Sequence, residues 1–414
     1  MNVLVLGIDL GTSGVRVAVL DQKKSLRYSQ SISYNVGLSR SEDWIQSCSK
    51  LIKGIPFDQR RRIRAVAVDG TSGTLLACDE QGVACGPALG YWQTCRGYEQ
   101  QLQELAPEGG PAASSSGSLA RALHLTKMYG SSTLLRHQAD WISGWLLNDW
   151  RWGEASNNFR LGWNPENSCW LNSLSEQVWQ NRLPTIRSSG IRLGTIARAR
   201  AKELRLPADL QVCTGTTDSN AAVLAAEPGE DDGVTVLGTT LAMKRFTKHP
   251  VQGQGVTNHY IRGKWLCGGS SNAGAGVLRR FFTDTQLNEL SRQINPESDS
   301  NLVFRPLPRP GERFPVDDPT LQPILEPRPT SDALYLHGLL EGLAEIEAQG
   351  WETLACLGAN RPKRVISLGG GARNPQWRRI RERRLGCPVI TCNQPPAAGV
   401  ARLALSDGQG QTID

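Results

Sequence analysis

The sequence predicts an α/β fold of two domains, on two observations. The chain has 414 residues, more than one hydrophobic core usually supports. A strand–turn–strand pattern also occurs twice, beginning near residues 3 and 233. Elsewhere short strands alternate with helical segments, and we expect helices near residues 43–53 and 333–348 and a strand at 364–368. The turn-forming segment 228–233 interrupts the pattern, so we place the domains at residues 1–228 and 229–414, with a last helix that could pack back on the first domain.

The first repeat is predicted to grip phosphate. Aliphatic runs at residues 3–8 and 15–20 read as strands, and the turn between them is rich in glycine and hydroxyl groups. Its glycines permit positive φ and close approach of a ligand, while its hydroxyl and N–H groups can donate to phosphate oxygens. The expected nucleotide-binding residues are Gly11, Thr12, Ser13, Gly14 and Arg16. Asp9, at the end of the first strand, can hold Mg²⁺ through waters.

The second repeat follows the same logic. A strand at 233–237 leads into the turn residues Gly238, Thr239 and Thr240. One such turn alone is equally typical of an ordinary β-hairpin. Two copies in the right order favour two related domains that face one nucleotide.

Asp218 is the candidate general base. It follows the strand 210–213 and a loop of glycine and threonine residues, and it opens the small-residue helix 221–226. The alternative is an aspartate that only caps the helix. Beside the two turns the catalytic interpretation is favoured.

The glycine-rich loop 369–377 opens a further helix, where backbone can approach a nucleotide closely. Asn374 would hydrogen-bond to adenine and Trp377 would stack on it. The alternative is a strand-to-helix turn with a packing tryptophan.

Composition excludes several classes of protein. Hydrophobic residues at 39% and charged residues at 21% are ordinary globular values, so the chain is neither disordered nor fibrous.

The formal charge is +7, but the basic clusters 60–64 and 378–384 lack interleaved aromatic residues, which disfavours nucleic-acid binding. Ten scattered cysteines and five histidines show no metal-ligand spacing. P-loop, dinucleotide-binding and serine-hydrolase motifs are missing. Without a signal peptide or membrane span, we expect a soluble, cytoplasmic protein.

Four segments together resemble the FGGY carbohydrate kinases: residues 9–13 (DLGTS), 215–218 (GTTD), 237–240 (LGTT) and 369–375 (GGGARNP). Their order and spacing cover essentially the whole chain, and the combination is highly specific. The resemblance implies an actin-like ATPase fold, in which two ribonuclease-H-like domains flank a nucleotide cleft. It also implies hinge closure over the substrate.

The resemblance further implies ATP and Mg²⁺ as cofactors. Asp218 would be the catalytic base, Asp9 would organise Mg²⁺ through water, and Thr12 and Thr239 would contact phosphate. The adenine site would comprise Gly370, Gly371, Asn374 and Trp377.

Two features depart from the larger members of that family. They often carry Trp-x-Asp-x-Arg in the sugar site, whereas residues 92–96 read WQTCR here and lack the carboxylate. The chain is also shorter. With residues 69–74 (DGTSGT), these features resemble compact kinases of cyanobacteria and plants that are similar to xylulokinase but favour D-ribulose. The expected substrate contacts are Asp9, Ser13, Ser72, Trp92, Arg96, Asp218 and Ser219.

We therefore expect a kinase that transfers the γ-phosphate of ATP to a small ketose, D-ribulose first and D-xylulose as the alternative. A sugar-sensing, weak ATPase of the same fold is the alternative from another class, although Asp9 and Asp218 argue against it. The expected partner is a pentulose, with no nucleic acid and no membrane, for a monomer or homodimer.

Overall fold

A computed structural model describes residues 3–108 and 110–405, which form two units, each built on its own six-stranded sheet. Within the described residues, unit 1 comprises residues 3–108, 110–225, 260–262 and 394–405. Unit 2 comprises residues 226–259 and 263–393. This division differs from the limits 1–228 and 229–414, chiefly because the C-terminal helix packs within unit 1.

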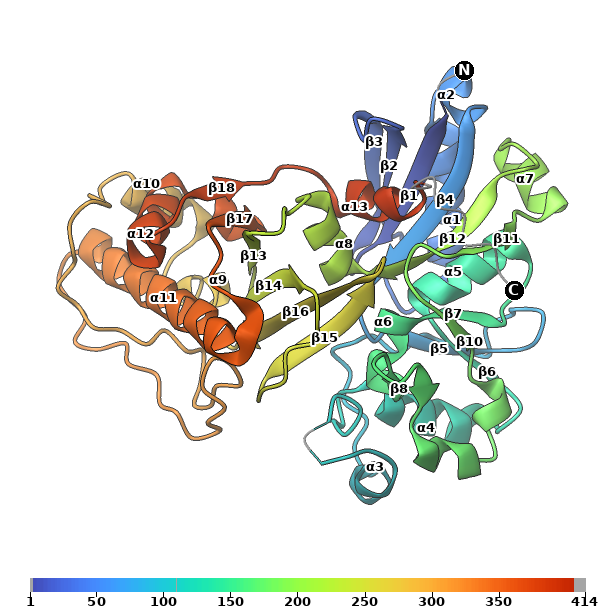
Figure 1. Ribbon diagram of the computed structural model, residues 1–414, viewed down its shortest axis with the longest axis horizontal. Helices are drawn as coiled ribbons and strands as arrows, with labels where there is room; N and C mark the ends of the chain where they lie inside the picture. Colours follow the sequence, from blue (N-terminus) through green and yellow to red (C-terminus); the bar gives the residue numbers. More distant parts are fainter. Residues whose placement is uncertain (1–2, 109, 406–414) are drawn as a thin grey trace. The chain divides into compact units, whose positions relative to one another are not determined.

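The sheet of unit 1 has the strand order β11-β12-β4-β1-β2-β3 (Figure 1). Its strands are β1 (Leu4–Leu10), β2 (Gly14–Asp21), β3 (Leu26–Ser33), β4 (Ile63–Gly70), β11 (Arg192–Thr195) and β12 (Gln211–Thr217). Strands β1, β4 and β12 are parallel, while β2, β3 and β11 pair antiparallel to their neighbours. The carboxyl ends of β1, β4 and β12 therefore meet at one edge of the sheet, where open α/β sheets bind ligands.

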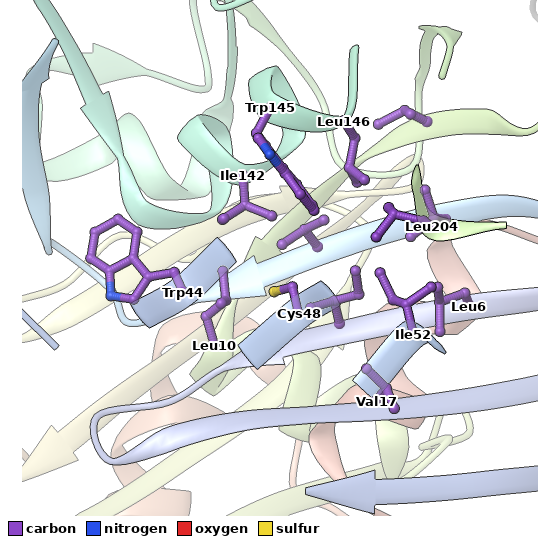
Figure 2. Packing of buried hydrophobic residues seen from close by; sticks show 14 of the residues in the cluster. Leu6, Leu10, Val17, Trp44, Cys48, Ile52, Ile142, Trp145, Leu146 and Leu204 are labelled. Atoms are coloured by element: carbon purple, nitrogen blue, oxygen red, sulfur yellow. The ribbon is translucent and has the colours of Figure 1, made fainter. Parts of the chain in front are cut away.

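Side-chain alternation divides the strands between two faces. On one face, the strands pack on α1 (Ser41–Gly54) and α5 (Gln138–Leu147). Figure 2 shows this core, with Leu6, Leu10 and Val17 from the strands, Trp44, Cys48 and Ile52 from α1, and Ile142, Trp145, Leu146 and Leu204 beside them.

The other face is covered by α13 (Pro396–Leu403), which also packs on α8 (Asp218–Ala225). Two glycines make this packing possible. A Cβ on Gly7 would lie 1.9 Å from the Ala397 carbonyl oxygen, and one on Gly399 would lie 1.8 Å from that of Ala221. Residues 394–405 therefore belong to unit 1 because their small side chains match a small-residue path across β1 and α8.

The remaining elements of unit 1 precede β11 or lie between it and β12. They are α2 (Phe57–Arg60), β5 (Leu75–Cys78), α3 (Glu99–Leu105), α4 (Ser118–Tyr129), β6 (Leu134–His137), β7 (Trp152–Glu154), α6 (Ala155–Asn158), η1 (Phe159–Leu161), β8 (Trp163–Asn164), β9 (Cys169–Trp170), η2 (Asn172–Glu176), η3 (Gln180–Arg182), β10 (Thr185–Arg187) and α7 (Arg198–Leu204). The short strands pair as β5–β6, β7–β10 and β8–β9.

Unit 2 repeats the topology of unit 1. Its sheet has the order β15-β16-β14-β13-β17-β18, and the pairings of β16-β14-β13-β17-β18 reproduce those of β3-β2-β1-β4-β12 in direction. The elements are β13 (Asp232–Leu237), β14 (Leu241–Thr247), β15 (Val256–Ile261), β16 (Lys264–Ser271), α9 (Ala275–Leu278), α10 (Asp284–Ser291), α11 (Asp332–Leu354), η4 (Ala355–Ala359), β17 (Arg364–Leu368), η5 (Gly370–Arg373), α12 (Pro375–Leu385) and β18 (Val389–Thr391). Helix α11 packs on α12, β14 and β16.

Candidate active site

The first phosphate turn closes β1 onto β2. The Gly11 N–H donates to the Gly14 carbonyl at 2.9 Å, and the hydroxyl-bearing residues Thr12 and Ser13 are exposed. Gly14 is required for a reason other than positive φ, because neither turn glycine has one. A Cβ on Gly14 would lie 2.1 Å from the Ile32 carbonyl oxygen of β3. The expectation of positive φ was therefore wrong, and strand packing explains Gly14.

Asp9 lies at the end of β1 with 1% of its surface exposed. Its Oδ2 accepts a hydrogen bond from Arg16 Nη1 at 3.0 Å, and the Arg16 side chain is 46% exposed. Arg16 is thus paired with Asp9 in this structure, at the base of the turn where we expected it to meet phosphate.

Asp69 is a neighbouring carboxyl group that sequence reasoning missed as a site residue. The parallel register of β1 and β4 places Asp69 opposite Asp9, and the register of β4 and β12 places it opposite Thr216, two residues before Asp218. The Asp69 side chain is fully buried, and its carboxyl group lies within hydrogen-bonding reach of the Asp9 carboxyl. Burial, followed by the charges of Asp9 and Asp218, raises the pKa of Asp69 well above its usual range.

Asp218 is the first residue of α8 and is half-buried. The capping contact at this helix end comes from its neighbour, because Thr217 Oγ1 accepts from the Asn220 N–H at 3.4 Å. Asp218 Oδ1 accepts from the adjacent Ser219 N–H at 2.7 Å, and Ser219 is exposed. The capping alternative for Asp218 is therefore weakened, since a threonine already serves that purpose.

The expected sugar contacts lie on two loops of unit 1. Ser72 is half-buried, whereas Trp92 is 54% exposed and Arg96 is exposed. The Trp92 ring meets Tyr91 edge-to-face, with centroids 5.1 Å apart. The Tyr91 hydroxyl accepts from Thr12 Oγ1 at 3.5 Å, so this loop lies beside the phosphate turn.

A residue of α5 anchors the loop that carries Ser72. Gln138 Oε1 accepts from the Thr71 hydroxyl at 2.8 Å and from the Thr71 N–H at 3.1 Å. The Thr71 and Thr74 hydroxyls lie 2.6 Å apart. These buried hydrogen bonds fix the backbone on both sides of Ser72.

The second phosphate turn, in unit 2, is wrapped by the glycine-rich segment that follows β16. The Ala275 N–H donates to the Gly238 carbonyl at 2.9 Å, and the Gly276 N–H donates to the Thr239 carbonyl at 3.3 Å. Thr239 and Thr240 remain exposed. The turn therefore presents its hydroxyl groups outward, as the first one does.

The loop that opens α12 differs from the expected adenine site. Asn374 caps the helix, since its Oδ1 accepts from the Trp377 N–H at 3.0 Å, and its Nδ2 donates to Ser291 Oγ at 2.8 Å. The Trp377 side chain is 1% exposed, and a Cβ on Gly371 would lie 2.4 Å from its ring. Asn374 and Trp377 thus support the loop here, which favours the packing alternative, while Gly370 is exposed.

The described residues contain neither a metal-binding cluster nor a membrane-spanning helix. Across residues 3–108 and 110–405, no three or more His, Cys, Asp or Glu side chains gather in a way that could hold a metal ion. Over the same ranges, no helix combines the length and apolar character needed to cross a membrane.

Comparisons with known proteins agree on one family. Residues 233–407 match the FGGY family of carbohydrate kinases, C-terminal domain. A xylulose kinase of Lactococcus lactis is 24% identical, over 97% of this chain and 87% of its own length. A xylulose kinase of Staphylococcus epidermidis is 22% identical, over 97% and 87%.

Solved structures confirm the fold. The xylulose kinase of Rhodospirillum rubrum superposes with a TM-score of 0.84 at 16% identity, covering 98% of this chain and 91% of that one. Glycerol kinase of Plasmodium falciparum, solved with ADP, superposes with a TM-score of 0.80 at 14% identity, covering 97% and 89%. The predicted α/β, actin-like ATPase fold is the fold of this chain.

Proposed function

The chain belongs to the FGGY family of carbohydrate kinases, and on that premise we propose that it transfers the γ-phosphate of ATP to a hydroxyl of a small ketose. Family membership makes it a phosphotransferase with an alcohol group as acceptor. Relatives named xylulose kinase favour D-xylulose as the acceptor. The segment 69–74 and the missing carboxylate in residues 92–96 keep D-ribulose as the second candidate.

The half-buried carboxylate of Asp218 carries the proposal. It stands at the start of α8, beside the edge where β1, β4 and β12 end, and Thr217 relieves it of the capping role. Asp218 is assigned as the base that accepts the proton of the attacking sugar hydroxyl while the new O–P bond forms and ADP departs. General-base catalysis of this kind contributes a factor of about 10² to 10⁴.

The two threonine-bearing turns are assigned to the phosphate chain. Thr12 and Ser13 in unit 1 and Thr239 and Thr240 in unit 2 are exposed on tight turns, which suits donation to phosphate oxygens. Gly11 suits this as well, because it has no Cβ to stand between a ligand and the turn.

Asp9 is assigned to the metal. Its carboxylate fits a magnesium site that keeps several waters and takes one or two protein carboxylates. Arg16, bonded to Asp9 Oδ2, holds that carboxylate in place. Mg²⁺, when bound, neutralises charge on the phosphate oxygens. Ser72, Trp92, Arg96 and Ser219 remain the assigned sugar contacts.

A coupled assay of ADP release tests the proposal. Purified protein with ATP and Mg²⁺ is mixed with D-xylulose, D-ribulose, their L-enantiomers, glycerol or no acceptor. One pentulose should stimulate ADP release by a factor of about 10² or more over the rate without acceptor. Stimulation of less than twofold by every acceptor would overturn the proposal and favour a sensor with weak ATPase activity.

A further inference from the structure

One buried arginine outside the expected site binds the two loops that carry the sugar contacts. Arg121 lies on α4 and is 1% exposed. Its guanidinium donates only to backbone carbonyl oxygens. These are Gly90 (from Nε, 3.1 Å), Gly73 (from Nη1, 3.1 Å), and Tyr91, Gln93 and Ser116 (from Nη2, 2.5, 3.0 and 2.8 Å).

This environment is unusual for a buried cation, which is ordinarily paired with a carboxylate. In the part of the chain that the structure describes, no carboxylate forms an ion pair with Arg121. Burial lowers the pKa of Arg121 to about 10, so the group stays charged at neutral pH. The five carbonyl dipoles therefore provide its solvation, and charge-assisted hydrogen bonds of this kind are stronger than neutral ones.

The planar shape of the guanidinium fixes the distance between the two loops that it binds. Its N–H groups point in fixed directions within one plane, so the carbonyls that accept from them are held at fixed relative positions. Gly73 directly follows Ser72, and Tyr91 and Gln93 flank Trp92. A Cβ built on Gly73 would also lie 3.8 Å from the Tyr91 Cβ, so the two loops touch where Arg121 joins them.

We propose that Arg121 is a positioning residue for the acceptor sugar: it sets the spacing and orientation of the loops that present Ser72 and Trp92. This inference rests on the proposed function, in which those side chains contact the ketose. Arg121 acts through the loops and not on the sugar, because all three of its nitrogens already donate to backbone and its side chain is buried. Through Tyr91, the same loop also contacts Thr12 of the phosphate turn.

Arg121→Lys tests the inference. Lysine keeps the charge, but its three donors radiate from one atom and cannot span five carbonyls in the arginine plane. We expect the KM for the pentulose to rise at least about tenfold, with kcat and the KM for ATP within about twofold of wild type, because ground-state sugar binding is lost. Without any substrate, hydrogen exchange of the backbone in residues 89–96 should accelerate at least about tenfold.

Arg136→Lys is the matched control. Arg136 is also buried in unit 1, and burial lowers its pKa to about 10 as well. Like Arg121 it donates to backbone carbonyls, in this case the three of Leu135, Trp150 and Arg182. None of those carbonyls belongs to the sugar loops. Arg136→Lys should leave the pentulose KM and the exchange of residues 89–96 unchanged.

The inference is overturned if Arg121→Lys leaves the pentulose KM and loop exchange within twofold of wild type, or if Arg136→Lys raises both equally. Should Arg121→Lys fail to fold, Gly73→Ala disturbs the same junction from the loop side, since Gly73 has a φ of +92°, which side-chain-bearing residues rarely adopt. That variant must then raise the pentulose KM. The exchange measurement needs no turnover, so it separates failure of this inference from failure of the proposed function.

Discussion

Glu347→Gln should destabilise unit 2 by about 3 to 5 kcal/mol, the usual cost of breaking a buried ion pair by removing one partner. Glu347 and Arg381 are both fully buried. Arg381 donates to both oxygens of Glu347, with Nε at 2.5 Å and Nη2 at 2.7 Å, and Thr235 Oγ1 donates to the same carboxylate at 2.6 Å. The substitution leaves the Arg381 cation buried without a charge partner.

The magnitude converts into a melting shift. At about 2 to 4 °C per kcal/mol for a unit of this size, the transition of unit 2 should fall by about 10 °C. Thermal unfolding measures the shift, and hydrogen exchange of β17 and α12 locates it, because Arg381 Nη1 also donates to Ser367 Oγ on β17. The two elements frame the loop at Gly370, so the KM for ATP should rise more than that for the ketose.

Lys363→Met provides the control, since the Lys363–Asp231 pair is 2.9 Å long but its side chains are 79% and 62% exposed. Exposed pairs of this kind contribute little, so stability should not change measurably. A loss below about 1 kcal/mol in Glu347→Gln would refute the reasoning from burial.

Two other perturbations follow from the structure of unit 1. Burial, with the nearby charge of Glu154, raises the pKa of Asp140 to about 8, so the folded state holds a proton there that the unfolded state releases near pH 4. Folding stability is therefore lost as the pH rises from about 4 to about 8. Asp140→Asn should reduce the difference in unfolding free energy between pH 5 and 8 by about 4 kcal/mol. An unchanged pH profile in urea unfolding would contradict this. Gly399→Ala places a Cβ 1.8 Å from the Ala221 carbonyl oxygen and should separate α13 from α8. The expected result is a loss of soluble protein that melts cooperatively. Gly54→Ala is the control, because Gly54 lies at an exposed helix end, and this variant should melt like wild type. Equal melting of both variants would show that the close approach is dispensable.

Helices and strands with strong local sequence patterns were predicted correctly. The helix expected near residues 43–53 is α1 (Ser41–Gly54), the one near 333–348 is α11 (Asp332–Leu354), and the strand 364–368 is β17. The two helices have long periodic patterns, and β17 is a short apolar run that ends at a glycine-rich loop, so the type of each element needs no tertiary information.

The features that were missed depend on contacts between distant segments. Asp69 became a site neighbour only through the register of β4 beside β1, some sixty residues away. Gly14 packs against the Ile32 carbonyl oxygen of β3, and no local pattern indicates that contact. A signal for Asp69 existed, since an acidic residue at the end of a buried strand is rare outside functional sites.

Trp377 illustrates a different limit. An aromatic residue in the first turn of a helix after a glycine-rich loop suits a stacking site and a packed core equally well at the level of sequence. Its 1% exposure distinguishes the two in this structure. Trp377 belongs to the hydrophobic core of unit 2, whose members on β13, β14 and α11 lie far away in the sequence and give no local signal.

The carboxylate of Asp218 is the most direct place to test the account. With the acceptor that best stimulates ADP release, Asp218→Asn should lower kcat by a factor of about 10² to 10⁴, with the melting temperature and the ketose KM close to wild type. Asp209→Asn, at a side chain that is 71% exposed, should leave turnover unchanged. Turnover by Asp218→Asn within about threefold of wild type would contradict the assignment of the base, and with it the proposed mechanism.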